Sequence, residues 1–343
     1  MEKFIVGSYS DNKTSIPTAC GAGLSIISLD DTKGTLSIDY QTNEIDNPSY
    51  FYINKKTDEL YICSERCTVD GEITVYDYKN KIIKKQFSSN GKATCHVNYD
   101  DLTKTIYYTN YLSGDIGLYH LDTEEDDYYQ FKGKSINKER QESPHPHCLI
   151  FHKNEIFVSD LGTDLIYIFD RTISNFLLKE TIQVPKGYGP RHLLTFNNHL
   201  YVVCELNSII LNYSYDQASE NWVLIQECAT EMSELMNISN PAALKVVEKK
   251  DYRIITVSNR FSNGLRQFKV KKDGNLHFIK DIRLEGVCPR DFCFSKDGKW
   301  VLVAEQDSNF IELYKVNDEG IIEDQLVSTL KINTPVCIKT IDL

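Results

Sequence analysis

The sequence has no long apolar run, no secretory leader pattern and no excess of positive charge. Its apolar stretches, such as the one from Leu200 to Cys204, are a handful of residues long, whereas a membrane-spanning helix needs about 18 or more. The N-terminal segment MEKFIVGSYSDNK turns polar after one short apolar patch, which predicts a cytoplasmic protein without a membrane partner. The 49 acidic and 38 basic residues leave a net charge of -11, which argues against nucleic-acid binding.

Paired cysteine motifs and the common catalytic signatures are also missing. The 10 cysteines are dispersed along the chain, which favours reduced, mostly buried thiols over a disulfide framework. Cys63 and Cys67 have no second pair with zinc-site spacing, so a structural zinc is not expected. No Gly-rich phosphate loop, GxSxG elbow or HExxH occurs, which disfavours P-loop, serine-hydrolase and zinc-protease chemistry. We therefore expect no metal and no cofactor.

The sequence does contain a repeat with a period of about 50 residues. Its first segment recurs as PSYFYI from Pro48, TCHVNY from Thr94, PHCLIF from Pro146, PRHLLTF from Pro190, PAALKVV from Pro241, PRDFCF from Pro289 and PVCIKTI from Pro335. The first six are each followed by a second apolar segment, such as LYICSE or VLVAEQ, and by a third, such as ITVYDY or IELYKV. Short β-branched and aromatic runs bounded by Gly, Asn and Asp are typical of strands.

A four-stranded unit with this period is typical of a β-propeller blade. The seventh first segment stands at the C-terminus, and FIVGSYS and GLSIISL at the N-terminus match its missing second and third segments. We therefore predict an all-β, seven-bladed β-propeller, a single domain over residues 1–343, with one four-stranded blade closed by strands from both chain ends. A β-sandwich or a pair of β-domains is the alternative. The best helical candidate is short, residues 230–236.

Polar residues stand at the ends of the second segments. In a propeller these ends lie on the same face as the starts of the first strands, so their side chains are expected to meet at one mouth of the channel. The residues are Ser8, Glu65, Asn110, Asp160, Glu205, Asn259 and Glu305. Asn110 and Asp160 are equally compatible with a structural role, because Asn and Asp often bond backbone groups in turns.

Cationic residues are expected at the same mouth. The first segments begin with His96, His147, Arg191, His192 and Arg290, with Asp291 beside the last, His145 just upstream of His147, and Arg260 at the end of a second segment. Arginine binds carboxylate or phosphate through paired hydrogen bonds, which predicts a small anionic ligand, although each arginine could instead pair with a neighbouring blade. His147 is a candidate general acid or base, with Glu205 orienting it or sharing the role. A histidine held by backbone bonds, or one of two metal-binding histidines with His145, is the alternative.

The segments QESPHPHCLIF and IFVSDLGTDLIYIFD resemble the GPHxH...ADLGxDxxxxY block of the lactonase-type seven-bladed propellers, which include bacterial 6-phosphogluconolactonases and fungal carboxymuconate lactonising enzymes. GYGPRHLLTF, VVCELNS, SNRFSNGLRQFKV and CPRDFCFSKDGKWVLVAEQDSNFIELYKV resemble its later blades in the same order. The resemblance implies hydrolysis of 6-phospho-D-glucono-1,5-lactone to 6-phosphogluconate, the second step of the oxidative pentose phosphate pathway. It also implies four catalytic positions: His147, Arg191, Glu205 and Arg260. The Thr-Cys-His sequence at His96 departs from the family pattern, which has proline before this histidine, and weakens the case for that residue.

The mechanism expected from this arrangement needs no metal. His147 or Glu205 would deprotonate a water that attacks the lactone carbonyl, Arg191 would stabilise the oxyanion, and Arg260 or Arg290 would hold the phosphate. The remaining mouth residues are expected to bind substrate: His145, His192, Arg290, Asp291, Glu65 and Glu305. Two alternatives stay open: a cycloisomerase or a lactonase for another acid lactone, and a propeller that binds a metabolite or peptide without chemistry. The protein is expected to be a monomer or a weak homo-oligomer.

Overall fold

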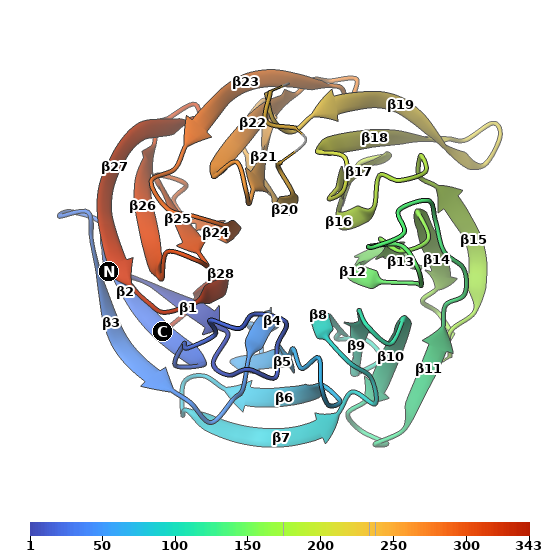
Figure 1. Cartoon of the computed structure of the whole chain (residues 1–343), viewed down its shortest axis with the longest axis horizontal. Helices are drawn as coiled ribbons and strands as arrows, with labels where there is room; N and C mark the ends of the chain where they lie inside the picture. Colours follow the sequence, from blue (N-terminus) through green and yellow to red (C-terminus); the bar gives the residue numbers. More distant parts are fainter. Residues whose placement is uncertain (174, 233, 237) are drawn as a thin grey trace. The chain divides into compact units, whose positions relative to one another are not determined.

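The computed structural model describes every residue except 174, 233 and 237, and its described residues form an all-β fold. In this part of the chain, 28 strands are arranged in seven four-stranded sheets (Figure 1). The chain divides into two compact units. Unit 1 comprises residues 1–6, 25–41 and 192–341, and unit 2 comprises residues 7–24, 42–191 and 342–343. The prediction of a single domain stays a prediction.

Unit 2 holds three of the sheets, each made of consecutive strands. The first contains β4 (Pro48–Asn54), β5 (Glu59–Ser64), β6 (Glu72–Asp77) and β7 (Ile82–Ser88). The second contains β8 (Thr94–Asp100), β9 (Thr105–Asn110), β10 (Asp115–His120) and β11 (Asp126–Gln130). The third contains β12 (Pro146–His152), β13 (Glu155–Asp160), β14 (Leu165–Asp170) and β15 (Leu178–Gln183).

Unit 1 holds most of the other four sheets. Three of them again use consecutive strands: β16 (Pro190–Phe196), β17 (His199–Cys204), β18 (Ile209–Asp216) and β19 (Asn221–Ala229); β20 (Pro241–Glu248), β21 (Arg253–Asn259), β22 (Gly264–Val270) and β23 (Leu276–Arg283); β24 (Pro289–Phe294), β25 (Trp300–Glu305), β26 (Phe310–Val316) and β27 (Ile322–Lys331). The fourth has the order β28 (Pro335–Ile341), β1 (Glu2–Ser8), β2 (Leu24–Asp30) and β3 (Thr35–Thr42).

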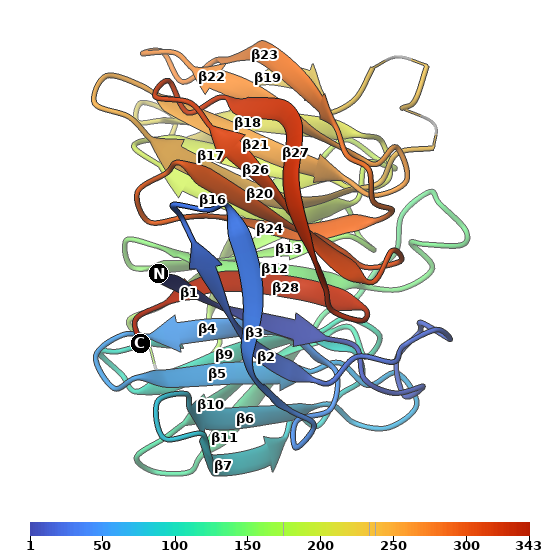
Figure 2. The ribbon, with the colours of Figure 1, turned by 90° about the vertical axis from the view of Figure 1, so that its left-hand side faces the viewer.

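This fourth sheet joins the two ends of the chain. Strand β28 lies beside β1, as Figure 2 shows, so the C-terminal strand is the first strand of a sheet whose other strands come from the N-terminus. The predicted closure by strands from both termini is confirmed. All seven predicted first segments are also strands, and each starts at the predicted residue.

The burial pattern explains why the strands fall in this order. The inner strands, such as β9, are buried along their whole length, whereas fourth strands such as β7 and β11 alternate between exposed and half-buried positions. A strand covered on both faces reads as a continuous apolar run, and one with a solvated face alternates. Within each unit the apolar side chains of neighbouring sheets form shared clusters, for example between β5 and β8.

The expected short helix over residues 230–236 is not found. Residue 233 lies outside the described residues, and the described residues around it form turns, with the Leu235 N–H bonded to the carbonyl of Met232. The hydroxyl of Ser208 stabilises the turn conformation of this segment, because it hydrogen-bonds to the backbone carbonyls of Met236 and Ser239.

A core substitution in the sheet that joins the chain ends tests its contribution to stability. Phe4 of β1 is fully buried in a cluster with Ile338 of β28 and Leu302. We expect Phe4→Ala to lower the free energy of unfolding by about 3–5 kcal/mol, because it leaves a cavity in a packed core. The matched control is Ile38→Ala on β3 of the same sheet, which is 40% exposed and should change it by less than about 0.5 kcal/mol. Urea denaturation of both variants measures the difference, and equal losses would contradict the assignment.

Candidate functional site

In several sheets the first strand begins with a local irregularity in its pairing. In β12 and β24 the register with the next strand shifts between the first and third residues, which places His147 and Arg290 at a bulge. The same shift occurs at the start of β4 and β8. A bulge re-aims the side chain of the extra residue and ends regular pairing. Two predicted site residues therefore stand at positions where the strand backbone turns a side chain away from the ladder.

In unit 2 the two histidines of the HPH sequence surround one tyrosine. The ring of His145 stacks on Tyr111 with 4.5 Å between centroids, and its Nδ1 is 2.9 Å from the Tyr111 carbonyl. The ring of His147 meets the same tyrosine edge-on at 5.8 Å. His145 also lies 3.3 Å from the exposed carboxylate of Glu142. His147 is 8% exposed, so its ring is held in place yet close to solvent.

The segment that carries these histidines is fixed by Asp160 at the end of β13. Its Oδ1 accepts hydrogen bonds from the backbone N–H groups of His145 at 2.6 Å and Gly162 at 2.9 Å, and its Oδ2 accepts one from Thr163 at 2.8 Å. A Cβ on Gly162 would lie 1.9 Å from the carbonyl oxygen of Ser143, so a glycine is required there. The structural reading of Asp160 is thereby confirmed.

Asp164 plays the same part for the loop that leads to Arg191, and sequence reasoning missed it. It accepts hydrogen bonds from the N–H groups of Gly187 and Gly189 at 2.6 and 2.7 Å. The carbonyl of Arg191 accepts a 2.6 Å bond from the hydroxyl of Ser159. Arg191 is buried. The two glycines in the Gly-Tyr-Gly-Pro sequence before this arginine were the signal that could have pointed to a loop held by backbone hydrogen bonds.

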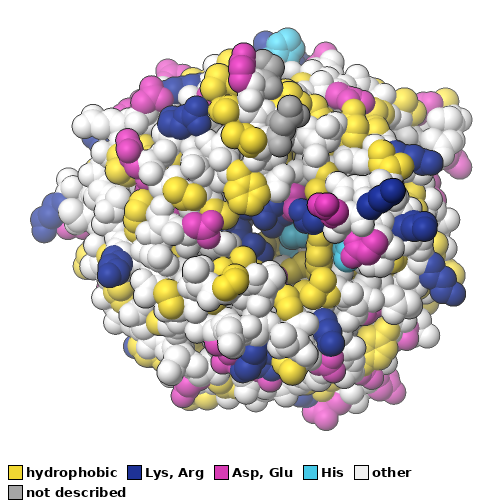
Figure 3. All heavy atoms as spheres, viewed as in Figure 1, with side chains coloured by type: hydrophobic (Ala, Val, Ile, Leu, Met, Phe, Trp, Pro, Cys, Tyr) yellow, Lys and Arg dark blue, Asp and Glu magenta, His cyan; other side chains and the backbone are white. Residues whose placement is uncertain are grey.

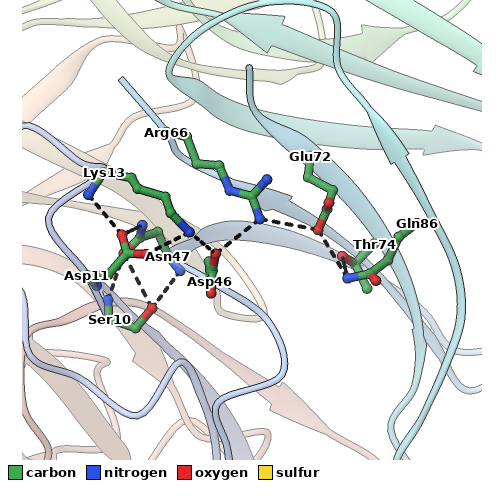
Figure 4. A network of polar contacts seen from close by, with 9 residues as sticks. All are labelled: Ser10, Asp11, Lys13, Asp46, Asn47, Arg66, Glu72, Thr74 and Gln86. Carbon is green, nitrogen blue, oxygen red and sulfur yellow. Dashed lines mark hydrogen bonds and ion pairs between the residues drawn. The ribbon is translucent and has the colours of Figure 1, made fainter. Parts of the chain in front are cut away.

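Glu65 is buried in unit 2 and accepts a 2.7 Å hydrogen bond from the Tyr9 hydroxyl. Next to it in the chain, Arg66 contributes to the polar network in Figure 4, where Asp46 lies 3.2 Å from Arg66 and 2.7 Å from Lys13. The network continues on one side to Asn47, Asp11 and Ser10, and on the other to Glu72, Gln86 and Thr74. The segment after β1 is thus tied to the turns before β4 and β6.

In unit 1 the two predicted catalytic residues form an ion pair. Arg260 Nη2 lies 2.9 Å from Glu205 Oε2, and both side chains are largely buried. Arg260 is further fixed by a 3.2 Å bond from Nε to the carbonyl of Asn240 and by Phe261, whose ring lies 5.8 Å from the guanidinium carbon. A buried carboxylate and guanidinium stabilise each other's charged forms, so this pair is a preformed dipole.

Arg290 and Asp291, which follow each other in β24, have different partners. Arg290 Nη1 donates to Gln306 at 3.2 Å. Asp291 is buried, lies 3.0 Å from Lys245 and accepts a 3.0 Å bond from the backbone N–H of Ile338 in β28. Asp291 therefore holds β28 in place as well as standing at a predicted substrate-binding position. Lys245 was not foreseen, because nothing in its own segment distinguishes it from a surface lysine.

Glu305 is fully buried at the end of β25, and neither of its carboxyl oxygens has a hydrogen-bond partner among the described residues. Burial raises its pKa well above the ordinary value, and the nearby carboxyls of Glu312 and Asp307 raise it further. Glu312 is also buried with a raised pKa, but it accepts hydrogen bonds from Tyr314 and from the N–H of Gly286. Burial without hydrogen-bond partners therefore favours the protonated form of Glu305.

Comparison with known proteins shows which family has this architecture. Residues 3–340 match the model of the lactonase family, described as a 7-bladed beta-propeller. The chain belongs to this family. The all-β, seven-bladed propeller predicted from the repeat and the resemblance to this family are both confirmed, and the seven sheets are its blades.

Individual relatives agree with this family. The chain is 26% identical to the 6-phosphogluconolactonase of Bacillus subtilis over 357 residues, covering 99% of each chain. It is 27% identical to an uncharacterised protein of Lactococcus lactis, covering 91% of this chain and 92% of the relative. Among solved structures, a protein from Lactobacillus plantarum superposes with a TM-score of 0.88 at 23% identity, and the periplasmic gluconolactonase of Pseudomonas aeruginosa with 0.85 at 19%, each over 99% of both chains. The two structures show the fold alone.

The blade register corrects one expectation about the second strands. Seven polar residues were predicted at one repeated position, but β5 ends at Ser64 and β17 at Cys204, so Glu65 and Glu205 lie one residue further along. Arg260 takes the same further position after Asn259. The alternation of short strands does not reveal where pairing stops, which is why the sequence did not separate the two positions.

The two positions have different contacts. At the last strand residue, Asn110 donates to the carbonyl of Ser89 at 3.1 Å and Asn259 to that of Thr230 at 2.6 Å. These amides, like Asp160, tie loops to the ends of second strands, which confirms the structural reading of Asn110. One residue further, Glu65 and Glu205 bond to side chains from a neighbouring blade. Glu65, Glu205 and Arg260, which lie one residue beyond their strands, are therefore better candidates for ligand contact than the residues that end the strands.

The predicted residues are divided between the two units. Glu65, His145, His147 and Arg191 belong to unit 2, and His192, Glu205, Arg260, Arg290, Asp291 and Glu305 belong to unit 1. Among the described residues, no three His, Cys, Asp or Glu side chains are grouped to hold a metal ion. No helix in the same part of the chain is long and apolar enough to cross a membrane.

The buried acid at Glu305 predicts a specific dependence of stability on pH. Because its pKa is raised in the folded state, the folded protein retains a proton that the unfolded chain releases above its ordinary pKa. Stability from this group is therefore complete at low pH and is lost as pH rises. Glu305→Gln, which mimics the neutral acid, should flatten part of the fall in Tm as pH rises above the ordinary pKa of a glutamate. Glu323→Gln, at an exposed position, is the control; an unchanged profile in Glu305→Gln would show that Glu305 is ionised.

Proposed function

We propose that this protein hydrolyses 6-phospho-D-glucono-1,5-lactone to 6-phosphogluconate, the second step of the oxidative pentose phosphate pathway. The proposal rests first on the lactonase family match over residues 3–340 and on the 6-phosphogluconolactonase of B. subtilis, which matches the chain over 99% of both lengths. The residues that the family pattern singles out are present at His147, Arg191, Glu205 and Arg260.

The buried Glu205–Arg260 pair is the observation that favours catalysis over passive binding. Its partners are 2.9 Å apart and largely removed from water, and charges in such an environment act on a bound substrate with little screening. A guanidinium that is already oriented loses little freedom when it binds an anion. We assign to Arg260 the recognition of the phosphate or carboxylate of the substrate.

The proposed reaction is a metal-free addition of water to the lactone carbonyl. His147 or Glu205 accepts a proton from the attacking water as its oxygen bonds to the carbonyl carbon. Arg191 stabilises the negative charge that develops on the carbonyl oxygen. The bond between that carbon and the ring oxygen then breaks, and the ring oxygen takes up a proton to become the free hydroxyl of the acid. No covalent enzyme intermediate is formed.

Hydrolysis of freshly prepared 6-phosphogluconolactone, followed in a pH-stat beside unphosphorylated gluconolactone, tests the proposal. We expect turnover that EDTA does not reduce and a His147→Ala variant with kcat/KM lowered by about 10²–10⁴-fold, the typical contribution of a positioned general base. His152→Ala, at the other end of the same strand β12, is the matched control and should retain activity. A wild-type protein that accelerates the hydrolysis of neither lactone would contradict the proposed function. Full activity in His147→Ala would indicate that Glu205 is the general base.

Separate substitutions of the two arginines distinguish their roles. Arg191→Ala should lower kcat for both lactones by about 10²–10³-fold, because it removes a partner of the oxyanion. Arg260→Ala should raise KM for the phosphorylated lactone and leave the unphosphorylated one little changed. An equal effect of Arg260→Ala on both substrates would contradict phosphate recognition and favour a lactonase for another acid lactone.

A further inference from the structure

Unit 1 contains a cleft that the proposed function does not use. It has a volume of about 360 Å³ and is bounded by the turns that connect β16 to β17, β20 to β21 and β22 to β23. These turns are at the opposite ends of β17 and β21 from Glu205 and Arg260. Since β17 has six residues, the cleft lies roughly 20 Å from that pair along the strand.

The cleft is lined mainly by cations and amides. Its charged side chains are Arg253, Lys271, Lys272 and one acid, Asp251, and the rest of the lining includes Asn197, Asn198 and His199. The chain as a whole carries a net charge of -11. An excess of cations in one concave site is therefore opposite in sign to the charge of the whole protein. Such a concentration of positive charge attracts anions.

The cations of the cleft differ from most other lysines and arginines of this protein. Basic and acidic side chains are interspersed over the face shown in Figure 3, and lysines such as Lys56 and Lys84 have carboxylate partners. In the described part of the chain, the ammonium groups of Lys271 and Lys272 have no hydrogen bond or ion pair. Arg253 uses Nε to reach Glu248 at 2.8 Å, and its terminal nitrogens have no partner among the described residues.

The wall of the cleft is built rigidly around Gly274. Its carbonyl accepts hydrogen bonds from Tyr201 at 2.7 Å and from the Asn212 amide at 2.9 Å. Its φ is +79°, and a Cβ there would lie 2.1 Å from the ring of His199, so both conformation and space require glycine. This turn carries Lys271 and Lys272, whose backbones are thereby fixed against the rest of the unit.

The aromatic residues of the cleft are already covered. Phe196 stacks on Tyr201 with 4.7 Å between centroids, and the Arg253 guanidinium carbon lies 4.8 Å from the centre of the Phe196 ring. Lys269 lies over Tyr252 at 3.9 Å, and the hydroxyl of Tyr252 bonds to a backbone carbonyl of the next hairpin. A cation therefore already lies over each of these two lining rings, which leaves less aromatic surface for a planar base.

We propose that this cleft is a second anion site, for a sugar phosphate in its dianionic form. Arg253, Lys271 and Lys272 would bind the phosphate, because three cations that line one cleft match its charge and oxygens. The amides of Asn197 and Asn198 would bind hydroxyl groups of the sugar. The volume suits a ligand of this size. The proposal is independent of the lactonase reaction, since it uses none of the residues assigned to it.

Calorimetric titration with glucose 6-phosphate, which is not a lactone, tests the proposal. In Lys271→Ala/Lys272→Ala we expect Kd to rise by at least about tenfold, the factor that corresponds to loss of roughly one charge-assisted hydrogen bond. The control Lys299→Ala/Lys331→Ala removes two exposed lysines of the same unit, neither of which is in a turn that bounds the cleft, and should bind like the wild type. Arg260→Ala, which alters the candidate catalytic site, should keep the cleft's binding.

Four outcomes would overturn the site or its ligand. Absence of binding in both the wild type and Arg260→Ala removes it, and an equal loss in the Lys299/Lys331 control shows unspecific attraction to charge. Binding of glucose as tightly as glucose 6-phosphate excludes phosphate recognition, and equal binding of inorganic phosphate excludes recognition of the sugar. Because the substituted lysines are exposed, the folded state should be unaffected, which an unchanged Tm would verify. If the protein does not hydrolyse lactones, the binding measurements still test the cleft, because they need no lactone and no catalytic residue.

Discussion

The pairing of β28 with β1 is the constraint on which the rest of unit 1 depends. Strand β1 is buried over most of its length, and the N–H and C=O groups on its inner edge need the C-terminal strand as partner, since unpaired buried backbone groups are costly. The same pairing seats Ile338 in the cluster that contains Phe4. Asp291 adds a polar tie, because it accepts a bond from the Ile338 N–H and lies 3.0 Å from Lys245. Closure of the last blade and the arrangement of the candidate residues in β24 are therefore coupled.

The ends of the second strands show how one repeat serves both structure and chemistry. Their last residues, among them Asn110, Asp160 and Asn259, use short polar side chains to tie the adjoining loops. The residue that follows each is released from the ladder and can meet a side chain of the next blade, as Glu205 meets Arg260. Glu305 is also the last residue of a second strand, but its carboxyl oxygens have no hydrogen-bond partner among the described residues. It is therefore an exception among the residues that end the second strands.

Much of this architecture could be predicted because the repeat is regular. The seven first strands and the joining of the termini follow from the period and from the apolar segments, which depend on local strand preferences and burial. The bulges at His147 and Arg290 could not be predicted, because each lies at the second residue of its strand, before the regular pairing that the apolar pattern reflects. The hydrogen-bond and ion-pair partners of the candidate residues also could not be predicted from the sequence. Asp164 holds a loop 23 to 25 positions away, and such contacts follow from packing in three dimensions.

The order of the strands in the closing blade has a consequence for how the protein is made. Strand β1 is synthesised more than 300 residues before β28, which begins only at Pro335. At elongation rates of about 5–20 residues per second, the wait is on the order of half a minute. During that time an apolar strand has an open edge, which is a template for pairing with another nascent chain. The polar strand β3, five of whose eight residues are exposed, gives the same sheet a solvated outer face before its inner edge is paired.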